Sequence, residues 1–153
     1  GDKRGVYPLW VAVEEMTFGT LSQFYKNMLE ADREGIAQQY FGRKSVYIEN
    51  YLQCAVVARN IAAHGGRFYN RTRLSPAVKL PLTMRRNKVD NSSPFAYFYA
   101  IFELLPDADK FGFIREMEKL FRKYPAAEPS RMGFPVNWKA LLNVPGEPEE
   151  SDT

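Results

Sequence analysis

Residues 45–64 read SVYIENYLQCAVVARNIAAH and are followed by Gly65-Gly66. Ser45 suits a helix N-cap, and the glycine pair suits a C-terminal stop. The stretch therefore predicts the longest helix of the chain, with Cys54 on its apolar side as a core residue. The apolar positions recur at helical spacing: Ile48, Tyr51, Leu52, Ala55, Ala58 and Ala62.

Further helices are predicted before this one. Residues 8–17 and 20–30 suit two helices with a bend at Gly19, and residues 31–40 suit a short helix closed by Gly42. After the long helix, Pro76 and Pro81 oppose helix formation over residues 66–93. The stretch Asn91-Ser92-Ser93-Pro94 then indicates a loop that leads into a new helix.

The last third of the chain also has helical patterns. Residues 95–105 suit an aromatic-rich helix that ends at Pro106, and we assign its Phe95–Phe102 cluster to the core. Asp107 is expected to cap a helix over residues 108–124, and residues 136–143 suit one more short helix. The expected buried stripe of the 108–124 helix is Phe111, Ile114, Met117, Leu120 and Phe121. The predicted fold class is all-α, a helical bundle of about five or six helices.

Composition limits the class of protein. Hydrophobic residues make up 45% of the 153 residues and aromatic residues 14%, which excludes a disordered chain. No run of 18 apolar residues indicates a membrane span, and no signal peptide is visible. The single Cys and the single His cannot build a zinc site, so we expect no metal and no cofactor. These features predict a cytoplasmic protein of one domain over residues 1–145, followed by an acidic disordered tail over residues 146–153.

The basic residues are concentrated in one part of the chain. Residues 50–89 contain no Asp or Glu, whereas the remainder holds 13 basic and 18 acidic residues. A charge run is usually a solvated face, but eight cations without an acid, six of them Arg, favour phosphate binding. RNA or another nucleic acid is therefore the expected partner. The cations are Arg59, Arg67, Arg71, Arg73, Lys79, Arg85, Arg86 and Lys88.

The only histidine, His64, lies at the end of the predicted long helix. On a helical wheel Glu49, Gln53, Asn60 and His64 share a sector of about 60°, whereas Arg59 and His64 are about 140° apart. Arg59 and His64 could meet if the Arg curls around, if the last turn unwinds, or if a second copy packs alongside. A His before Gly-Gly also suits a helix C-terminus for purely structural reasons.

Two stretches resemble a known family. Pro8-Leu9-Trp10-Val11-Ala12-Val13-Glu14 with Phe18-Gly19-Thr20-Leu21-Ser22, and Arg59-Asn60-Ile61-Ala62-Ala63-His64 with Arg67, Asn70 and Arg71, resemble the Abi-like (AbiD/AbiF-type) abortive-infection proteins of bacteria. That family belongs to the HEPN superfamily of helical ribonucleases and RNA-binding domains. Gly65 stands where Abi-like proteins usually carry a second His. They also usually carry a helical region before the Pro-Leu-Trp segment, so this chain is either the C-terminal part of a longer protein or a short member.

The resemblance implies a HEPN-like bundle and a metal-independent endoribonuclease. Arg59, Asn60 and His64 would be catalytic, and RNA would be cleaved by its own 2′-OH to a 2′,3′-cyclic phosphate. The resemblance also implies a role in phage defence. The wide angle between Arg59 and His64 on one helix, and not the resemblance, leads us to expect a homodimer with a shared active site. An antitoxin or other regulator is unknown. Two alternatives remain open at this point, a non-catalytic RNA-binding module and a protein-interaction domain. The expected RNA-binding residues are Arg67, Asn70, Arg71, Arg73, Arg85 and Arg86.

Overall fold

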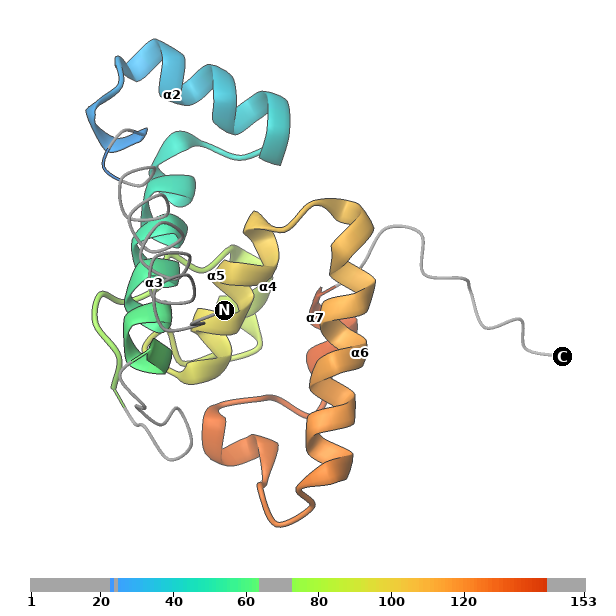
Figure 1. Ribbon diagram of the computed structural model, residues 1–153. Coiled ribbons are helices and arrows are strands. Elements are labelled where there is room, and N and C mark those ends of the chain that lie inside the picture. The colour runs from blue at the N-terminus through green and yellow to red at the C-terminus, as the bar shows by residue number, and fades with distance from the viewer. Residues whose placement is uncertain (1–22, 24, 64–72, 143–153) are drawn as a thin grey trace, which may run out of the picture.

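The computed structural model describes residue 23, residues 25–63 and residues 73–142 (Figure 1). Within these residues every regular element is a helix, so the predicted all-α class is confirmed. The elements in chain order are α2 (Glu30–Ile36), the π-helical turn η1 (Ala37–Phe41), α3 (Ser45–Ala63), α4 (Leu82–Arg86), α5 (Pro94–Leu104), α6 (Asp107–Lys123), the 3₁₀ turn η2 (Pro129–Met132) and α7 (Trp138–Leu142).

The centre of the bundle is the pair α3 and α5, which lie side by side in Figure 1. Helix α3 contributes one buried face, as predicted, with Ile48, Tyr51 and Cys54 almost fully covered. Helix α5 is covered nearly all round, which is why its sequence is apolar at most positions. The prediction that the Phe95–Phe102 cluster belongs to the core is confirmed, because only Phe98 and Ile101 in it are partly exposed.

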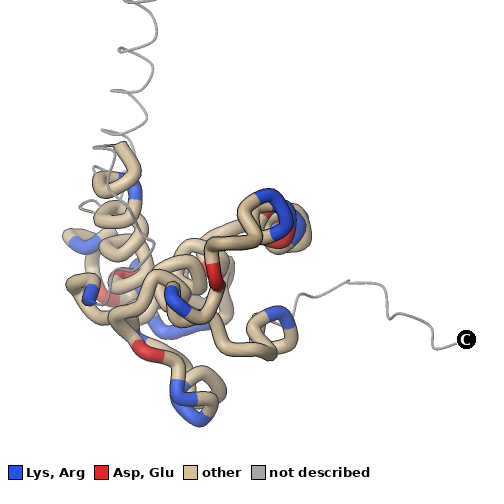
Figure 2. The backbone as a smooth tube through the Cα atoms, turned by 90° about the horizontal axis from the view of Figure 1, so that it is seen from below, with Lys and Arg blue, Asp and Glu red and all other residues tan. Residues whose placement is uncertain are grey.

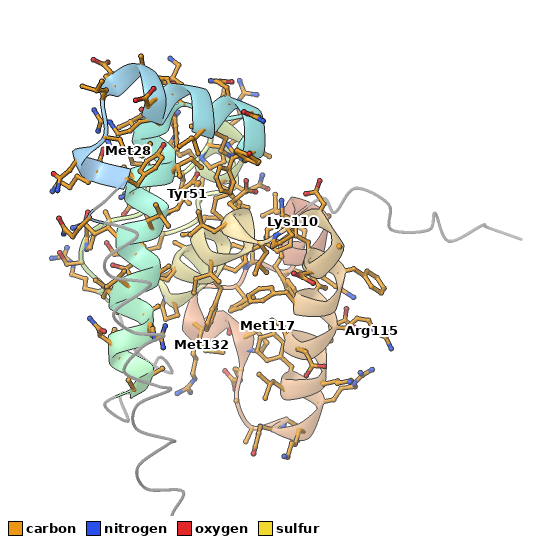
Figure 3. All side chains as sticks on the ribbon, turned by 45° about the horizontal axis from the view of Figure 1, so that its top comes forward. Met28, Tyr51, Lys110, Arg115, Met117 and Met132 are labelled. Atoms are coloured by element: carbon orange, nitrogen blue, oxygen red, sulfur yellow. The ribbon has the colours of Figure 1, made fainter. Side chains whose placement is uncertain are left out.

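Helix α6 packs at the margin of the bundle, beside α5 (Figure 1). Met117 projects toward α5, whereas Arg115 projects away from the bundle (Figure 3). Ile114 and Met117 are buried as predicted, but the predicted burial of Phe111 and Leu120 is wrong, since these residues are 38% and 50% exposed. A helix at the margin has only one narrow covered side, and the predicted stripe was too wide for it.

An aromatic cluster fixes the C-terminal elements on α6. The Phe121 ring meets the rings of Phe134 and Trp138 edge to face, with centroids 5.2 and 6.1 Å apart. Phe134 and Trp138 also contact each other at 5.4 Å. The predicted helix over residues 136–143 is confirmed as α7, whereas the 3₁₀ turn η2 before it was not predicted.

The predicted short helix over residues 31–40 is present as α2 followed by the π-helical turn η1. It ends at Gly42, as expected, because Gly42 adopts a left-handed φ of 61°. The break before α2 falls at Met28 and Leu29 rather than after residue 30. The predicted helix over residues 8–17 lies outside the described residues.

Two predicted caps differ from the structure. Ser45 is the first residue of α3, and its hydroxyl and backbone N–H both donate to the Glu34 carboxylate, at 2.7 and 3.2 Å. A carboxylate from the preceding helix thus supplies the acceptor that Ser45 was expected to supply. Asp107 is likewise inside α6, with Pro106 at the N-cap position.

The loop before α5 agrees with its prediction. Ser93 is the N-cap of α5, where its hydroxyl oxygen accepts the Ala96 N–H at 3.1 Å, and Pro94 is the first helical residue. Within the stretch expected to lack helix, however, α4 forms. Pro81 precedes that helix as its N-cap residue and therefore removes none of its hydrogen bonds.

Candidate nucleic-acid interface

Residues 73–88, which we call the basic strap, cross α3 and are held there by a buried side chain. Asn50 Nδ2 donates to the Ala77 carbonyl at 3.0 Å, and Asn50 Oδ1 accepts the Lys79 N–H at 2.8 Å. The neighbouring Tyr51 hydroxyl donates to the Lys79 carbonyl at 3.0 Å. Both backbone polar groups of Lys79 are thus paired with α3, which fixes the strap at this point.

A second set of contacts holds the strap at Pro76. The Tyr97 hydroxyl of α5 donates to the Pro76 carbonyl at 2.6 Å, and the Cys54 thiol lies 3.8 Å from the same oxygen. Four apolar strap residues enter the core beside these bonds. The strap is therefore a fixed part of the fold. The buried strap residues are Leu74, Val78, Leu80 and Met84.

The chain after α4 returns alongside the strap. The carbonyls of Ser92 and Asn91 accept the N–H groups of Leu74 and Val78, each at 2.8 Å. Helix α4 and the residues that follow it consequently form the tip of a closed loop. Arg85, Arg86 and Lys88 all lie at this tip.

The cations of the strap point outward. Lys79 is exposed between buried Val78 and buried Leu80, because side chains alternate along an extended segment. Within the described part of the chain, none of these cations forms an ion pair. Residues 73–89 contain five Lys and Arg and no Asp or Glu. Figure 2 marks the Lys and Arg positions of the described backbone in blue and the Asp and Glu positions in red. The strap therefore presents a field of one sign, which attracts phosphate groups. Its exposed cations are Arg73, Lys79, Arg85, Arg86 and Lys88.

The end of α4 has a tight reversal with an uncommon residue in it. Lys88 N–H donates to the Arg85 carbonyl at 3.0 Å, and Val89 N–H donates to the Met84 carbonyl at 3.1 Å. This is the Schellman arrangement, in which the residue after the C-cap is left-handed and usually Gly. Here that residue is Lys88, with φ of 57°. A cation is thus held in a conformation that costs a side-chain-bearing residue about 1–2 kcal/mol.

The predicted catalytic motif is only partly described. Arg59 is half-buried and Asn60 is exposed, both near the end of α3. His64, Arg67, Asn70 and Arg71 lie outside the described residues, so their geometry stays a prediction. On the polar side of α3, Gln53 and Asn60 are exposed as expected, whereas Glu49 pairs with Arg33 at 3.1 Å.

The strap brings one predicted RNA-binding residue toward this motif. Lys79 is bonded to Asn50 and Pro76 faces Cys54, so the strap runs antiparallel to α3 (Figure 1). Arg73 precedes Pro76 by three residues and therefore lies toward the end of α3 that carries Arg59 and Asn60. Arg85 and Arg86 belong to the other end of the strap. Arg73 and the Arg85–Arg86 pair therefore lie toward opposite ends of the strap, with Arg73 on the side of Arg59 and Asn60.

The anchors of the strap were missed from the sequence. Tyr51 was predicted only as part of the apolar face, and nothing local indicates that Asn50, Tyr51 and Tyr97 bond to residues 76–79. A polar Asn50 next to the apolar face of α3 was the available indication. Ala62, which was assigned to the apolar face, is exposed.

Burial changes the acidity of two groups beneath the strap. Loss of solvent raises the pKa of the Cys54 thiol to about 11. The same effect raises the pKa of Tyr51 to about 12. Both groups are therefore neutral near pH 7 and serve as hydrogen-bonding anchors. Neither is available there as a nucleophile or a charged base.

A separate cavity of about 650 Å³ lies between the ends of α2, α3, α5 and α6. Met28 lines it on the α2 side and Lys110 on the α6 side (Figure 3). Most of its walls are apolar, including Ile48 and Phe41. At its edge the charges are already paired, with Arg43 bonded to Glu103 at 2.9 Å and Lys110 to Asp107 at 3.2 Å. No chemistry is assigned to this cavity.

Among residues 23, 25–63 and 73–142, no three His, Cys, Asp or Glu side chains are grouped as a metal ion would require. None of the helices in the same ranges is long and apolar enough to cross a membrane.

The fold defines an all-α protein, and its strap carries basic residues and no acidic ones. The family model described as Abi-like protein matches residues 1–70. The predicted resemblance to the Abi-like family is thereby confirmed over residues 1–70. The match includes Arg59, Asn60 and His64 and ends just before Arg71. No curated protein and no solved structure matches the chain.

Proposed function

We propose that this chain acts in phage defence by abortive infection, as an Abi-like protein that binds and cleaves RNA. Two observations support the proposal. The Abi-like family model matches the part that carries the Arg59-Asn60-x3-His64 motif. The adjacent strap exposes five cations, all without an ion pair to any described residue, on a backbone that three buried side chains hold in place. A fixed array of unpaired cations is the arrangement that phosphate backbones bind.

The proposed chemistry is transesterification within the RNA strand. The 2′-oxygen forms a bond to the adjacent phosphorus and the bond from phosphorus to the 5′-oxygen breaks, which leaves a 2′,3′-cyclic phosphate and a 5′-hydroxyl. His64 takes the proton of the 2′-OH or returns one to the leaving oxygen, since its ordinary pKa suits either role near pH 7. Arg59 stabilises the negative charge that develops on the phosphate, and Asn60 orients the phosphate.

A second copy of the chain would complete this site. Arg59 and His64 are five residues apart on one helix, so their side chains diverge by about 140° on a regular helix. Two α3 helices packed side by side would place Arg59 of one beside His64 of the other. The homodimer stays a prediction.

The strap carries the RNA-binding half of the proposal, and its test is the salt dependence of binding. Arg85→Ala/Arg86→Ala should weaken binding of single-stranded RNA about equally for different sequences and reduce the salt slope by about 1.4, which corresponds to two phosphate contacts. Arg115→Ala/Arg122→Ala, two exposed arginines of α6, is the matched control and should change neither quantity. An unchanged slope in the strap variant would remove the strap from the interface.

One observation favours a second candidate function, RNA binding without cleavage. The strap and its anchors are complete without His64, so the surface could bind RNA whether or not the motif is active. This function predicts that His64→Ala leaves salt-dependent binding intact and that no product forms with either protein.

A further inference from the structure

We propose that the acidic segment 147–152 of this chain binds the basic strap in cis and competes there with RNA. The contact is an inference from charge and position in this structure. Only the competition depends on the proposed function. The acidic segment belongs to the same chain as the strap, so its binding would regulate the strap within one molecule.

The last described helix, α7, begins next to the tip of the strap. Asn137, directly before α7, donates through Nδ2 to Asn87 Oδ1 at 3.4 Å. Asn87 directly follows α4 and stands between Arg86 and Lys88. The start of α7 therefore touches the tip of the strap.

Helix α7 is itself firmly placed. Trp138 packs edge to face on Phe121 and Phe134, and Lys139 pairs with Glu118 of α6 at 3.5 Å. Leu142, its last residue, is buried. The chain that follows α7 therefore starts from a fixed point close to the tip of the strap.

The acidic segment and the strap carry opposite charges. Residues 143–153 contain four acids and no Lys or Arg, whereas the strap contains five cations and no acid. Strap cations lack an ion pair with any described residue, so an acidic segment displaces no existing pair when it binds. The four acids are Glu147, Glu149, Glu150 and Asp152.

The chain after α7 is long enough for its acids to reach the strap. Helix α7 rises by about 1.5 Å per residue, so its end lies roughly 7 Å from the contact at Asn137. Glu147 is five positions after Leu142, and an extended chain of that length spans up to about 17 Å. The first acid can therefore reach α4, and the five residues to Asp152 extend the range by about as much again.

A tethered competitor acts at an effective concentration in the mM range. If four carboxylates bind the strap with a dissociation constant of the same order, the apparent affinity for RNA falls about 2–5-fold at low salt. The effect should vanish when the Debye length drops below the spacing of the charges. Salt should therefore weaken the competition and the RNA binding together.

The experiment compares RNA binding by the 153-residue chain and a tail variant, Glu147→Gln/Glu149→Gln/Glu150→Gln/Asp152→Asn. The tail variant should bind single-stranded RNA about 3-fold more tightly at about 50 mM salt and equally at about 300 mM salt. The matched control Glu30→Gln/Asp32→Asn/Asp109→Asn/Glu116→Gln makes the same charge change on exposed positions of α2 and α6. Equal tightening in the control would overturn the proposal, because the effect would then come from net charge alone.

A second readout uses no RNA. A spin label on Ser151→Cys should broaden the NMR signals of amides 82–89 at low salt, and the buried Cys54 should remain unlabelled. Arg85→Ala/Arg86→Ala should reduce the broadening. No broadening in the unaltered strap would overturn the proposal. Broadening without RNA binding by any variant would support the contact and reject the proposed function instead.

Discussion

The side chain of Asn50 and the backbone of Lys79 are joined by a 2.8 Å hydrogen bond, although 29 residues separate them. Lys79 is exposed while its neighbours Val78 and Leu80 are buried. The buried side-chain amide of Asn50 on α3 thus fixes where the basic strap lies on the surface and in which direction it runs. Any RNA bound to the strap would be positioned through this bond.

Replacing Asn50 should therefore cost stability. Asn50→Ala leaves the Ala77 carbonyl and the Lys79 N–H without their partner, at about 1–3 kcal/mol for each. We expect the free energy of unfolding to fall by about 2–4 kcal/mol, as measured by urea denaturation. Gln53→Ala, one turn along on the exposed side of α3, should change it by less than about 0.5 kcal/mol. Similar values for the two variants would contradict the anchoring role.

Lys88 offers a test of backbone strain at the strap tip. Lys88→Gly relieves the left-handed conformation, and Lys88→Ala retains it, while both remove the same charge. The Gly variant should be more stable than the Ala variant by about 1 kcal/mol in thermal or urea unfolding. Both variants should lose a similar small part of the RNA affinity. An Ala variant as stable as the Gly variant would show that Lys88 carries no strain.

Because Cys54 is buried, the free energy of unfolding should fall as the pH becomes alkaline. Its pKa is raised from 9.0 to about 11, so the unfolded chain ionises first as the pH rises. The stabilisation from the neutral buried thiol is fully present below pH 9 and is lost as the pH rises toward about 11. The drop in unfolding free energy between pH 8 and pH 10 should be smaller in Cys54→Ala than in the parent chain. At pH 8 a thiol reagent should modify Cys54 only after denaturant is added.

Much of the fold was predictable because it depends on local patterns. The apolar spacing in residues 45–64, the loop into Ser93-Pro94 and the stop at Gly42 each gave the correct element. The errors arose where the structure depends on contacts between residues that are far apart in the sequence. Glu34 supplies the acceptor at the start of α3, and the position of α6 at the margin leaves Phe111 and Leu120 exposed.

The candidate site was predictable in composition and not in geometry. The excess of Arg and Lys in residues 50–89 is visible in the sequence, and it is what indicated phosphate binding. The bonds from Asn50, Tyr51 and Tyr97 to residues 76–79 form only when α3 and α5 are packed together. Helix α4 was missed because Pro81 was read as a breaker, whereas a proline at the N-cap position is compatible with the helix that follows.

The most direct test of the central claim is cleavage of end-labelled single-stranded RNA by the purified chain in EDTA, beside a folded His64→Ala variant. We expect products with 2′,3′-cyclic phosphate ends from the parent chain and none from the variant. Salt-dependent binding by both proteins without any cleavage, or equal cleavage by both, would contradict it.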